Sequence, residues 1–227
     1  MMSEGSPFFP RAFIRELALD RPQLLGAILQ FNAGENRRAV QEAYPGMGFP
    51  DAILDRLVKD QAGFWDFEEE SRRLALVGPE ITLDLVLTWG SAFCAPILNR
   101  FILRSDVEIL HRDLGEKYLD FARGRGRFSL GDIYRILEVQ PDPMAVEDVR
   151  DQVLAWGLAA HDLVAASWPV PLRQIQDRCW ARELPQCHGL RRPPEAPPLP
   201  GMLRAVWFSM KKILIKEVAP QWTPCFS

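Results

Sequence analysis

The sequence predicts an all-α fold: a single globular domain of about eight to ten helices, followed by a Pro-rich spacer and a C-terminal helix. Apolar residues recur at intervals of three and four, and strict alternation over the length of a strand is scarce. Gly and Pro residues stand where the periodic stretches end. With 48% hydrophobic and 25% charged residues among 227, the composition is that of an ordinary folded domain.

The N-terminal part of the chain predicts four helices. The first spans Ala12–Leu19, and the second is capped by Asp20 and ends at Gly34. A short polar helix over Glu35–Tyr44 and a more regular amphipathic helix over Pro50–Ala62 follow.

The most apolar helix is predicted next. Residues Phe64–Val77 indicate a loop and a short helix. Pro79 begins a helix that runs to about Ala92 and is apolar on most sides, which is typical of a buried helix. Pro96 marks a kink or a break, after which the chain continues helically through Phe101.

A capping box is predicted at Ser105 and Glu108, where the hydroxyl and the carboxylate would each satisfy a free amide at a helix start. The helix that begins there runs to about Ala122. Gly124 and Gly126 then break the chain in an arginine-rich loop.

Three further helices complete the predicted main domain, which covers residues 1–190. A short helix follows Ser129, a long one spans about Met144–Ser167, and another short one spans Leu172–Glu183.

The segment 191–201 predicts an extended spacer, because six of its eleven residues are Pro or Gly. Residues 202–227 then form a C-terminal helix and tail, with helix over Met202–Ala219. Its apolar stripe can dock on the main domain, or the helix can be a detachable element that meets a partner or a membrane surface. Docking is favoured, since membrane-surface helices usually carry more cationic residues.

Charge and hydropathy argue against two classes of partner. The formal net charge is -3, whereas binding to nucleic acid requires an excess of cations. No apolar run reaches the roughly eighteen residues of a membrane span, and the best, Ile81–Phe93, contains Asp84, Thr88 and Ser91. Residues Met1–Pro10 lack the pattern of a secretory signal. A cytoplasmic chain is therefore expected.

The sequence predicts no catalytic residue, no cofactor site and no metal site. The four cysteines have no zinc or redox spacing, and free thiols are expected. Cys187 and His188 are adjacent, so their side chains would diverge. His111 is expected to be a solvated helix residue, and His161 does not face Asp162. No nucleophile motif and no phosphate-binding loop accompany them.

Two charged clusters are the candidate partner-binding residues. The arginine-rich loop can be the cationic end of a helix, stabilised by the helix dipole, or an anchor for an acidic protein surface or a phosphate. The acidic run can equally be a solvated face. The residues are Arg123, Arg125, Arg127, Glu68, Glu69 and Glu70.

Three blocks of this chain resemble the K subunit (SctK/YscK-like) of bacterial type III secretion systems. The first is the stretch Leu83–Leu119, with its Trp89-Gly90 pair and its Ala-Pro-Ile-Leu-Asn-Arg-Phe-Ile-Leu run. The others are Gln152–Ala159, followed by a Trp-Pro segment, and the ending Lys212–Pro220 with a nearby Cys-Phe pair.

The resemblance implies a non-enzymatic adaptor on the cytoplasmic side of the secretion machine, peripheral to the inner membrane through protein contacts. Its implied partners are the cytosolic domain of the inner-membrane ring protein and the Q subunit of the sorting platform, whose pods of Q and L subunits lead to the ATPase. It implies no cofactor and no membrane span.

A second hypothesis is a helical regulatory or small-ligand-binding protein of unrelated cytoplasmic function. This hypothesis is based on the seven Trp residues, some of which could line a cavity between helices. Large rings that simply fill a core are the simpler interpretation. Binding to nucleic acid ranks third.

Overall fold

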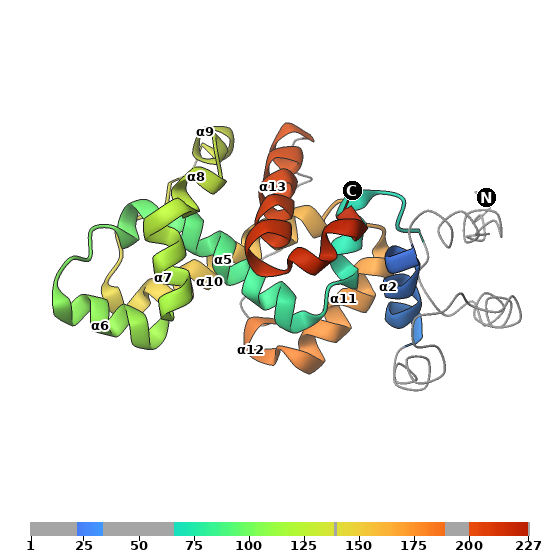
Figure 1. Cartoon of the computed structure of the whole chain (residues 1–227), viewed down its shortest axis with the longest axis horizontal. Helices are drawn as coiled ribbons and strands as arrows, with labels where there is room; N and C mark the ends of the chain where they lie inside the picture. The colour runs from blue at the N-terminus through green and yellow to red at the C-terminus, as the bar shows by residue number, and fades with distance from the viewer. Residues whose placement is uncertain (1–21, 34–65, 139, 189–199, 227) are drawn as a thin grey trace, which may run out of the picture. The chain divides into compact units, whose positions relative to one another are not determined.

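The computed structural model describes residues 22–33, 66–138, 140–188 and 200–226 (Figure 1). These residues contain ten α-helices, several short 3-10 and π segments and no strand, which confirms the all-α fold class. The helices predicted over Ala12–Leu19, Glu35–Tyr44 and Pro50–Ala62 lie outside the described residues, as does the spacer up to residue 199. The chain forms two compact units, Met1–Leu76 with Thr223–Ser227, and Val77–Trp222.

The smaller unit contains helix α2 (Pro22–Ala33) and the 3-10 helix η2 (Glu70–Leu76). Leu24 and Ile28 of α2 are buried and lie four residues apart, on one face of the helix. Phe31 meets Phe67 edge to face, with ring centroids 5.6 Å apart.

A buried arginine organises this unit. The guanidinium of Arg73 donates to the carbonyl oxygens of Phe67, Glu68 and Cys225 at 3.0, 3.1 and 2.9 Å. The three acceptors come from two distant stretches of the chain, and the fork of N–H donors suits such a clamp. Arg73 thereby joins the end of the chain to the segment before η2.

The larger unit is built on helix α5 (Pro79–Leu98), which is buried along most of its length. Among the described helices, α5 is long and apolar enough to span a membrane, with a mean hydropathy of 1.6; 72% of that window is buried inside the protein, as in a core helix. The expectation that no stretch is long and apolar enough for a membrane span is therefore wrong by length and composition. Thr88 donates to the Asp84 carbonyl oxygen at 2.7 Å, so its hydroxyl is satisfied within the helix.

Helix α10 (Val149–Ala165) crosses α5 so closely that the two backbones are in contact. A Cβ atom added at Gly90 would lie 2.0 Å from the Val153 carbonyl oxygen, and one added at Gly157 would lie 2.0 Å from that of Val86. Two glycines facing each other's helix therefore permit an approach that any side chain would prevent.

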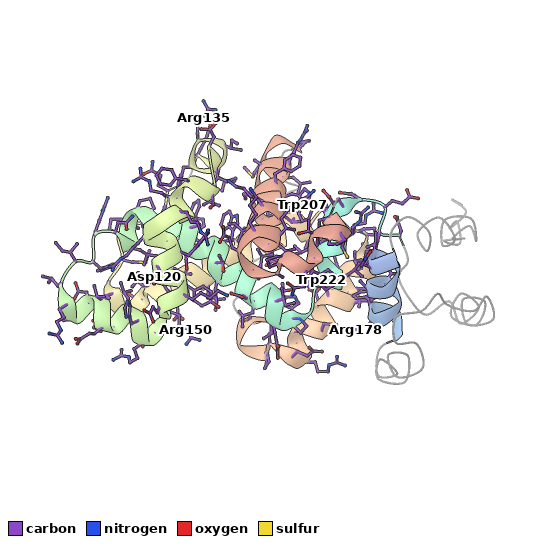
Figure 2. All side chains as sticks on the ribbon, in the orientation of Figure 1. Asp120, Arg135, Arg150, Arg178, Trp207 and Trp222 are labelled. Carbon is purple, nitrogen blue, oxygen red and sulfur yellow. The ribbon has the colours of Figure 1, made fainter. Side chains whose placement is uncertain are left out.

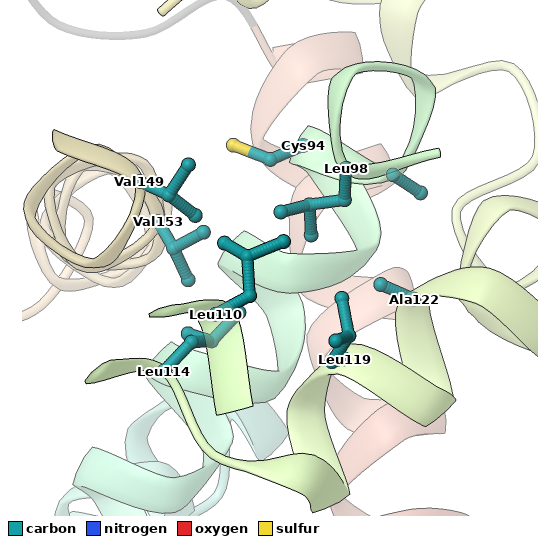
Figure 3. Packing of buried hydrophobic residues seen from close by; sticks show 9 residues of the cluster. Cys94, Leu98, Leu110, Leu114, Leu119, Ala122, Val149 and Val153 are labelled. Carbon is teal, nitrogen blue, oxygen red and sulfur yellow. The ribbon is translucent and has the colours of Figure 1, made fainter. Parts of the chain in front are cut away.

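The predicted helix from Ser105 to Ala122 is two helices, α6 (Arg104–Asp113) and α7 (Glu116–Phe121). Gly115 separates them, with a φ of 100° that other residues rarely adopt. Leu110, Leu114 and Leu119 from the two helices enter one apolar cluster with Leu98 of α5 and Val153 of α10 (Figure 3).

The predicted capping box is wrong. Helix α6 begins at Arg104 after an extended Leu103, and no side chain caps it. The Ser105 hydroxyl instead lies 3.2 Å from Asp106, and Glu108 pairs with Arg104 at 2.9 Å. An i,i+4 ion pair has taken the carboxylate that the box required.

The remaining helices surround α5 and α10. Shorter elements are the helices α9 (Ile133–Leu137) and α12 (Pro185–His188), and the 3-10 turn η4 (Val146–Asp148). Helix α11 (Val170–Glu183) covers the predicted Leu172–Glu183.

Helix α13 (Pro200–Ile213) packs its apolar face on α5 and α10 and continues into a π-helical turn, η5 (Leu214–Val218), and a 3-10 turn, η6 (Pro220–Phe226). The Trp89 indole donates to the Ser209 hydroxyl at 2.8 Å, which joins α5 to α13 inside the core.

Candidate partner-binding surface

The arginine-rich segment is helical, so the predicted loop is wrong. Residues Ala122–Gly126 form a π-helical turn, η3, which joins α7 to a last short helical turn, α8 (Arg127–Ser129). Gly126 faces α5, because a Cβ atom there would lie 2.9 Å from the Phe121 carbonyl oxygen and 3.3 Å from the Ala92 Cα. Gly126 therefore allows close packing and does not break the helix. The sequence alone does not tell these two roles of a glycine apart.

The three arginines of this segment have three different partners. Arg123 donates to the Phe101 carbonyl oxygen at 2.7 Å and so fixes the chain after α5. Arg125 pairs with Glu217 of η5 at 2.6 Å. The guanidinium of Arg127 lies over the ring of Phe128, 5.0 Å from its centroid. The three guanidinium groups therefore do not converge on a single anion-binding site.

A pocket of about 580 Å³ opens beside Arg125. Its walls come from α5, α7 and the two π-helical turns. The lining residues are Thr88, Lys117, Asp120, Phe121, Gly124, Arg125 and Glu217. Figure 2 labels Asp120, one of these lining residues. The lining thus combines two cations and two carboxylates with one aromatic ring.

The cations of the pocket are already neutralised within the protein. Lys117 lies 2.7 and 2.5 Å from the two carboxylate oxygens of Asp84. Burial, and then the Asp84 carboxylate, raises the pKa of the neighbouring Tyr118 above its ordinary value. Arg125 is balanced by Glu217, whose side chain is only 13% exposed. A pocket with paired charges favours mixed-charge protein surfaces over a free anion.

Both π-helical turns of the described chain contribute to this pocket. Gly124 and Arg125 belong to η3, and Glu217 belongs to η5. The Arg125–Glu217 ion pair joins the two turns directly. Single π turns within helices recur at functional sites, because they turn side chains away from the regular helical direction. The pocket is therefore the first candidate contact site.

The acidic cluster Glu68–Glu70 belongs to the smaller unit, whereas the arginines belong to the larger one. Glu69 accepts a hydrogen bond from the Ser71 hydroxyl at 2.8 Å and pairs with Arg72 at 3.2 Å. Glu68 is exposed, and Arg73 holds its carbonyl oxygen. The cluster is thus a locally paired surface with one outward carboxylate.

The histidines and cysteines have structural surroundings. His161 is buried, and its Nδ1 lies 3.7 Å from the Asp162 carboxylate, so the two are closer than predicted. The rings of Trp168 and Trp180 lie against His161, at centroid distances of 5.8 and 5.2 Å. His111 is exposed, as expected. The four cysteines are free thiols. Within the described ranges, no three His, Cys, Asp or Glu side chains are grouped to hold a metal ion.

Exposed aromatic residues are the candidate binding groups that sequence reasoning missed. Phe128 of α8 is 69% exposed and Phe208 of α13 is 49% exposed. An exposed Phe in a helix looks like a core residue in the sequence. The one available signal was spacing, since Phe208 lies four residues from both Arg204 and Lys212 and shares their face.

No protein-family model, no curated protein and no solved structure matches this chain. Among the described residues, the candidate contact groups are the paired-charge pocket and the exposed Phe128 and Phe208 side chains.

Proposed function

We propose that this chain is a non-enzymatic adaptor of the type III secretion sorting platform. It acts in the cytoplasm, held near the inner membrane by protein contacts. There it links the cytosolic domain of the inner-membrane ring protein to the pods of Q and L subunits and to the ATPase. The observation that carries the proposal is the resemblance of three separate sequence blocks to the K subunit of these systems.

The arrangement of those blocks supports the proposal. The first block begins within α5, contains α6 and ends within α7, the second lies within α10, and the third contains η5. Helices α5 and α10 cross at Gly90 and Gly157, one from each of the first two blocks, and α5 also contacts η5. Blocks that are distant in sequence thus form one packed core, as expected if the resemblance reflects a shared fold.

The surface supports an adaptor as well. Protein contacts draw most of their energy from a few aromatic and arginine side chains surrounded by paired polar groups. The larger unit presents Phe128 and Phe208 with Arg127 and Arg204 over their rings. The pocket beside Arg125 adds a recess with charges of both signs.

The proposal is tested by calorimetric titration of the purified full chain with the ring protein's cytosolic domain and, separately, with the Q subunit. We expect saturable binding to at least one. Arg125→Glu, which opposes Glu217 and alters the pocket, is expected to weaken binding by about tenfold. Arg173→Glu, an equal charge change on the exposed face of α11, is the matched control. Binding to neither protein would remove the proposal.

The alternative of a small-ligand-binding protein is favoured by one observation, the pocket volume of about 580 Å³. Such volumes fall in the range of small-molecule sites, although those are mostly apolar. Thermal unfolding of the full chain against a panel of nucleotides and metabolites discriminates the two functions, because a ligand that binds only the folded state raises the melting temperature. A shift that Arg125→Glu abolishes would favour the alternative.

A further inference from the structure

One face of α13 carries an exposed stripe of basic and aromatic residues. Arg204, Phe208 and Lys212 follow one another on α13 at intervals of four, Lys216 follows four residues later in the π-helical turn η5, and all four are exposed. The opposite face holds Val206, Trp207, Met210 and Ile213 in the core. Because residues four apart lie above one another on a helix, the exposed four form a line about 18 Å long.

Helix α8 extends this stripe on one side. The Lys212 ammonium lies 3.5 Å from the Ser129 carbonyl oxygen, and Ser129 directly follows Phe128. Contacts of α13 with α8 and α9 place the three helices side by side (Figure 1). The second exposed phenylalanine therefore adjoins the middle of the stripe.

An arginine guanidinium lies over each of the two exposed phenylalanine rings. The guanidinium of Arg204 lies 5.3 Å from the Phe208 ring centroid, and that of Arg127 lies 5.0 Å from the Phe128 centroid. Such stacking restricts a long side chain and leaves the in-plane N–H donors directed outward. A rigid aromatic with an oriented cation is a typical anchor for a protein partner.

The charge of this surface is positive, although the chain as a whole is acidic. The exposed cations of this surface are Arg127 and Arg204, which lie over the two rings, and Lys212 and Lys216. The nearby carboxylates of Asp132 and Glu217 lie 3.1 and 2.6 Å from Arg135 and Arg125, so each is balanced by another arginine. A complementary partner must therefore supply negative charge.

We propose that the stripe Arg204–Phe208–Lys212–Lys216, with Arg127 and Phe128, binds an acidic amphipathic helix of a partner protein. Apolar side chains of that helix pack on the two rings, and its carboxylates meet the four cations. A line of about 18 Å matches a partner helix of about twelve residues. The inference rests on the proposed function only in that the chain works by holding other proteins.

A protein segment fits this surface better than a membrane does. Helices that lie on membranes insert a continuous apolar face between the headgroups. The apolar face of α13 is already buried against α5 and α10, and the outward face offers single rings that stand among cations. Discrete anchors with fixed cations suit a groove-filling helix.

The test measures binding of the full chain to a fluorescein-labelled, fourteen-residue peptide of Glu and Leu at helical spacing, by fluorescence anisotropy. We expect Phe128→Ser/Phe208→Ser and, separately, Arg204→Glu/Lys212→Glu to weaken binding by at least about tenfold. The same peptide with Lys in place of Glu should not bind. Circular dichroism checks that each variant keeps the helical content of the native chain.

The matched control is Arg173→Glu/Arg178→Glu, which makes the same charge change at two exposed positions of α11 (Figure 2 labels Arg178). It should change the affinity by less than about twofold. Failure of the native chain to bind the acidic peptide would overturn the inference, as would equal losses in control and stripe variants. Stripe-dependent binding to phosphatidylglycerol vesicles without peptide binding would also overturn it, in favour of a membrane.

The same variants separate this inference from the proposed function. If the native chain binds the ring protein or the Q subunit and the stripe variants bind equally well, the function stands and the stripe is not the contact. If the native chain binds the acidic peptide through the stripe but binds neither secretion protein, the stripe stands and the assigned assembly is wrong.

Discussion

Pro96 lies inside α5, where it cannot supply the amide hydrogen that the Ala92 carbonyl oxygen would accept. The Tyr134 hydroxyl lies 2.6 Å from the carbonyl oxygen of Phe93 and 3.2 Å from that of Ala92. A side chain from α9 therefore replaces the missing backbone donor, and α5 continues to Leu98. Burial raises the pKa of Tyr134, so the hydroxyl keeps its proton at neutral pH.

We predict that Tyr134→Phe lowers the free energy of unfolding by about 1–3 kcal/mol, because buried carbonyl oxygens lose their donor. Urea denaturation followed by circular dichroism measures this. In a Pro96→Ala background the amide returns, and the same substitution should have a smaller effect. Equal effects in both backgrounds would show that the hydroxyl does not compensate for the proline.

Cys94 is buried in the apolar cluster between α5 and α10, and burial raises the pKa of its thiol from 9.0 to about 12. Above pH 9 the unfolded chain loses this proton while the folded chain keeps it. Stability is therefore complete below pH 9 and falls as the pH rises toward 12, with a slope of up to about 1.4 kcal/mol per pH unit.

Denaturation curves of the native chain and of Cys94→Ala between pH 8 and pH 10.5 check this prediction. The alanine variant is less stable throughout, since a buried side chain has been shortened, but its stability should fall less steeply above pH 9. Parallel pH profiles would mean that the Cys94 thiol ionises equally in both states.

The crossing of α5 and α10 depends on a pair of glycines, Gly90 and Gly157. A Cβ atom at Gly90 or Gly157 would lie 2.0 Å from a backbone oxygen of the other helix, and backbone cannot rotate away as a side chain can. The helices must separate before any larger residue fits, and the apolar cluster between them would open.

We predict that Gly90→Ala and Gly157→Ala each destabilise the protein by about 3 kcal/mol, at the upper end of overpacking effects. Chemical denaturation provides the measurement. Gly124→Ala is the control, because no atom lies within 4 Å of a Cβ atom built there. Its effect should be neutral or slightly stabilising, since alanine favours helix. A similar effect at all three positions would contradict the steric explanation.

The element boundaries show where sequence reasoning works and where it does not. Pro79 begins α5, as predicted, because a proline in the first turn loses no helical hydrogen bond. The capping box failed because Glu108 had a nearer partner in Arg104. Gly115, which was not singled out, separates two helices, whereas Gly126 stays within one. Local sequence does not reveal which glycines face another backbone.

In the larger unit, the packed core and the candidate contact surfaces are separate. Helices α5, α10 and α13 pack together in the core, and the outer surface carries the paired-charge pocket and the basic stripe. The three arginines that were predicted as contact residues have different positions in this arrangement. Arg123 holds the Phe101 carbonyl oxygen, Arg125 forms a wall of the pocket, and Arg127 stacks on an exposed ring.

The spacing of neighbouring residues was enough to predict the all-α class, the buried helix α5 and the apolar stripe of α13. The packed fold was needed to show that Gly90 and Gly157 meet, that the Tyr134 hydroxyl reaches α5, and that Phe128 and Phe208 remain outside the core. Each of these depends on which distant surface lies opposite a side chain, and periodicity along one helix carries no information about its neighbour.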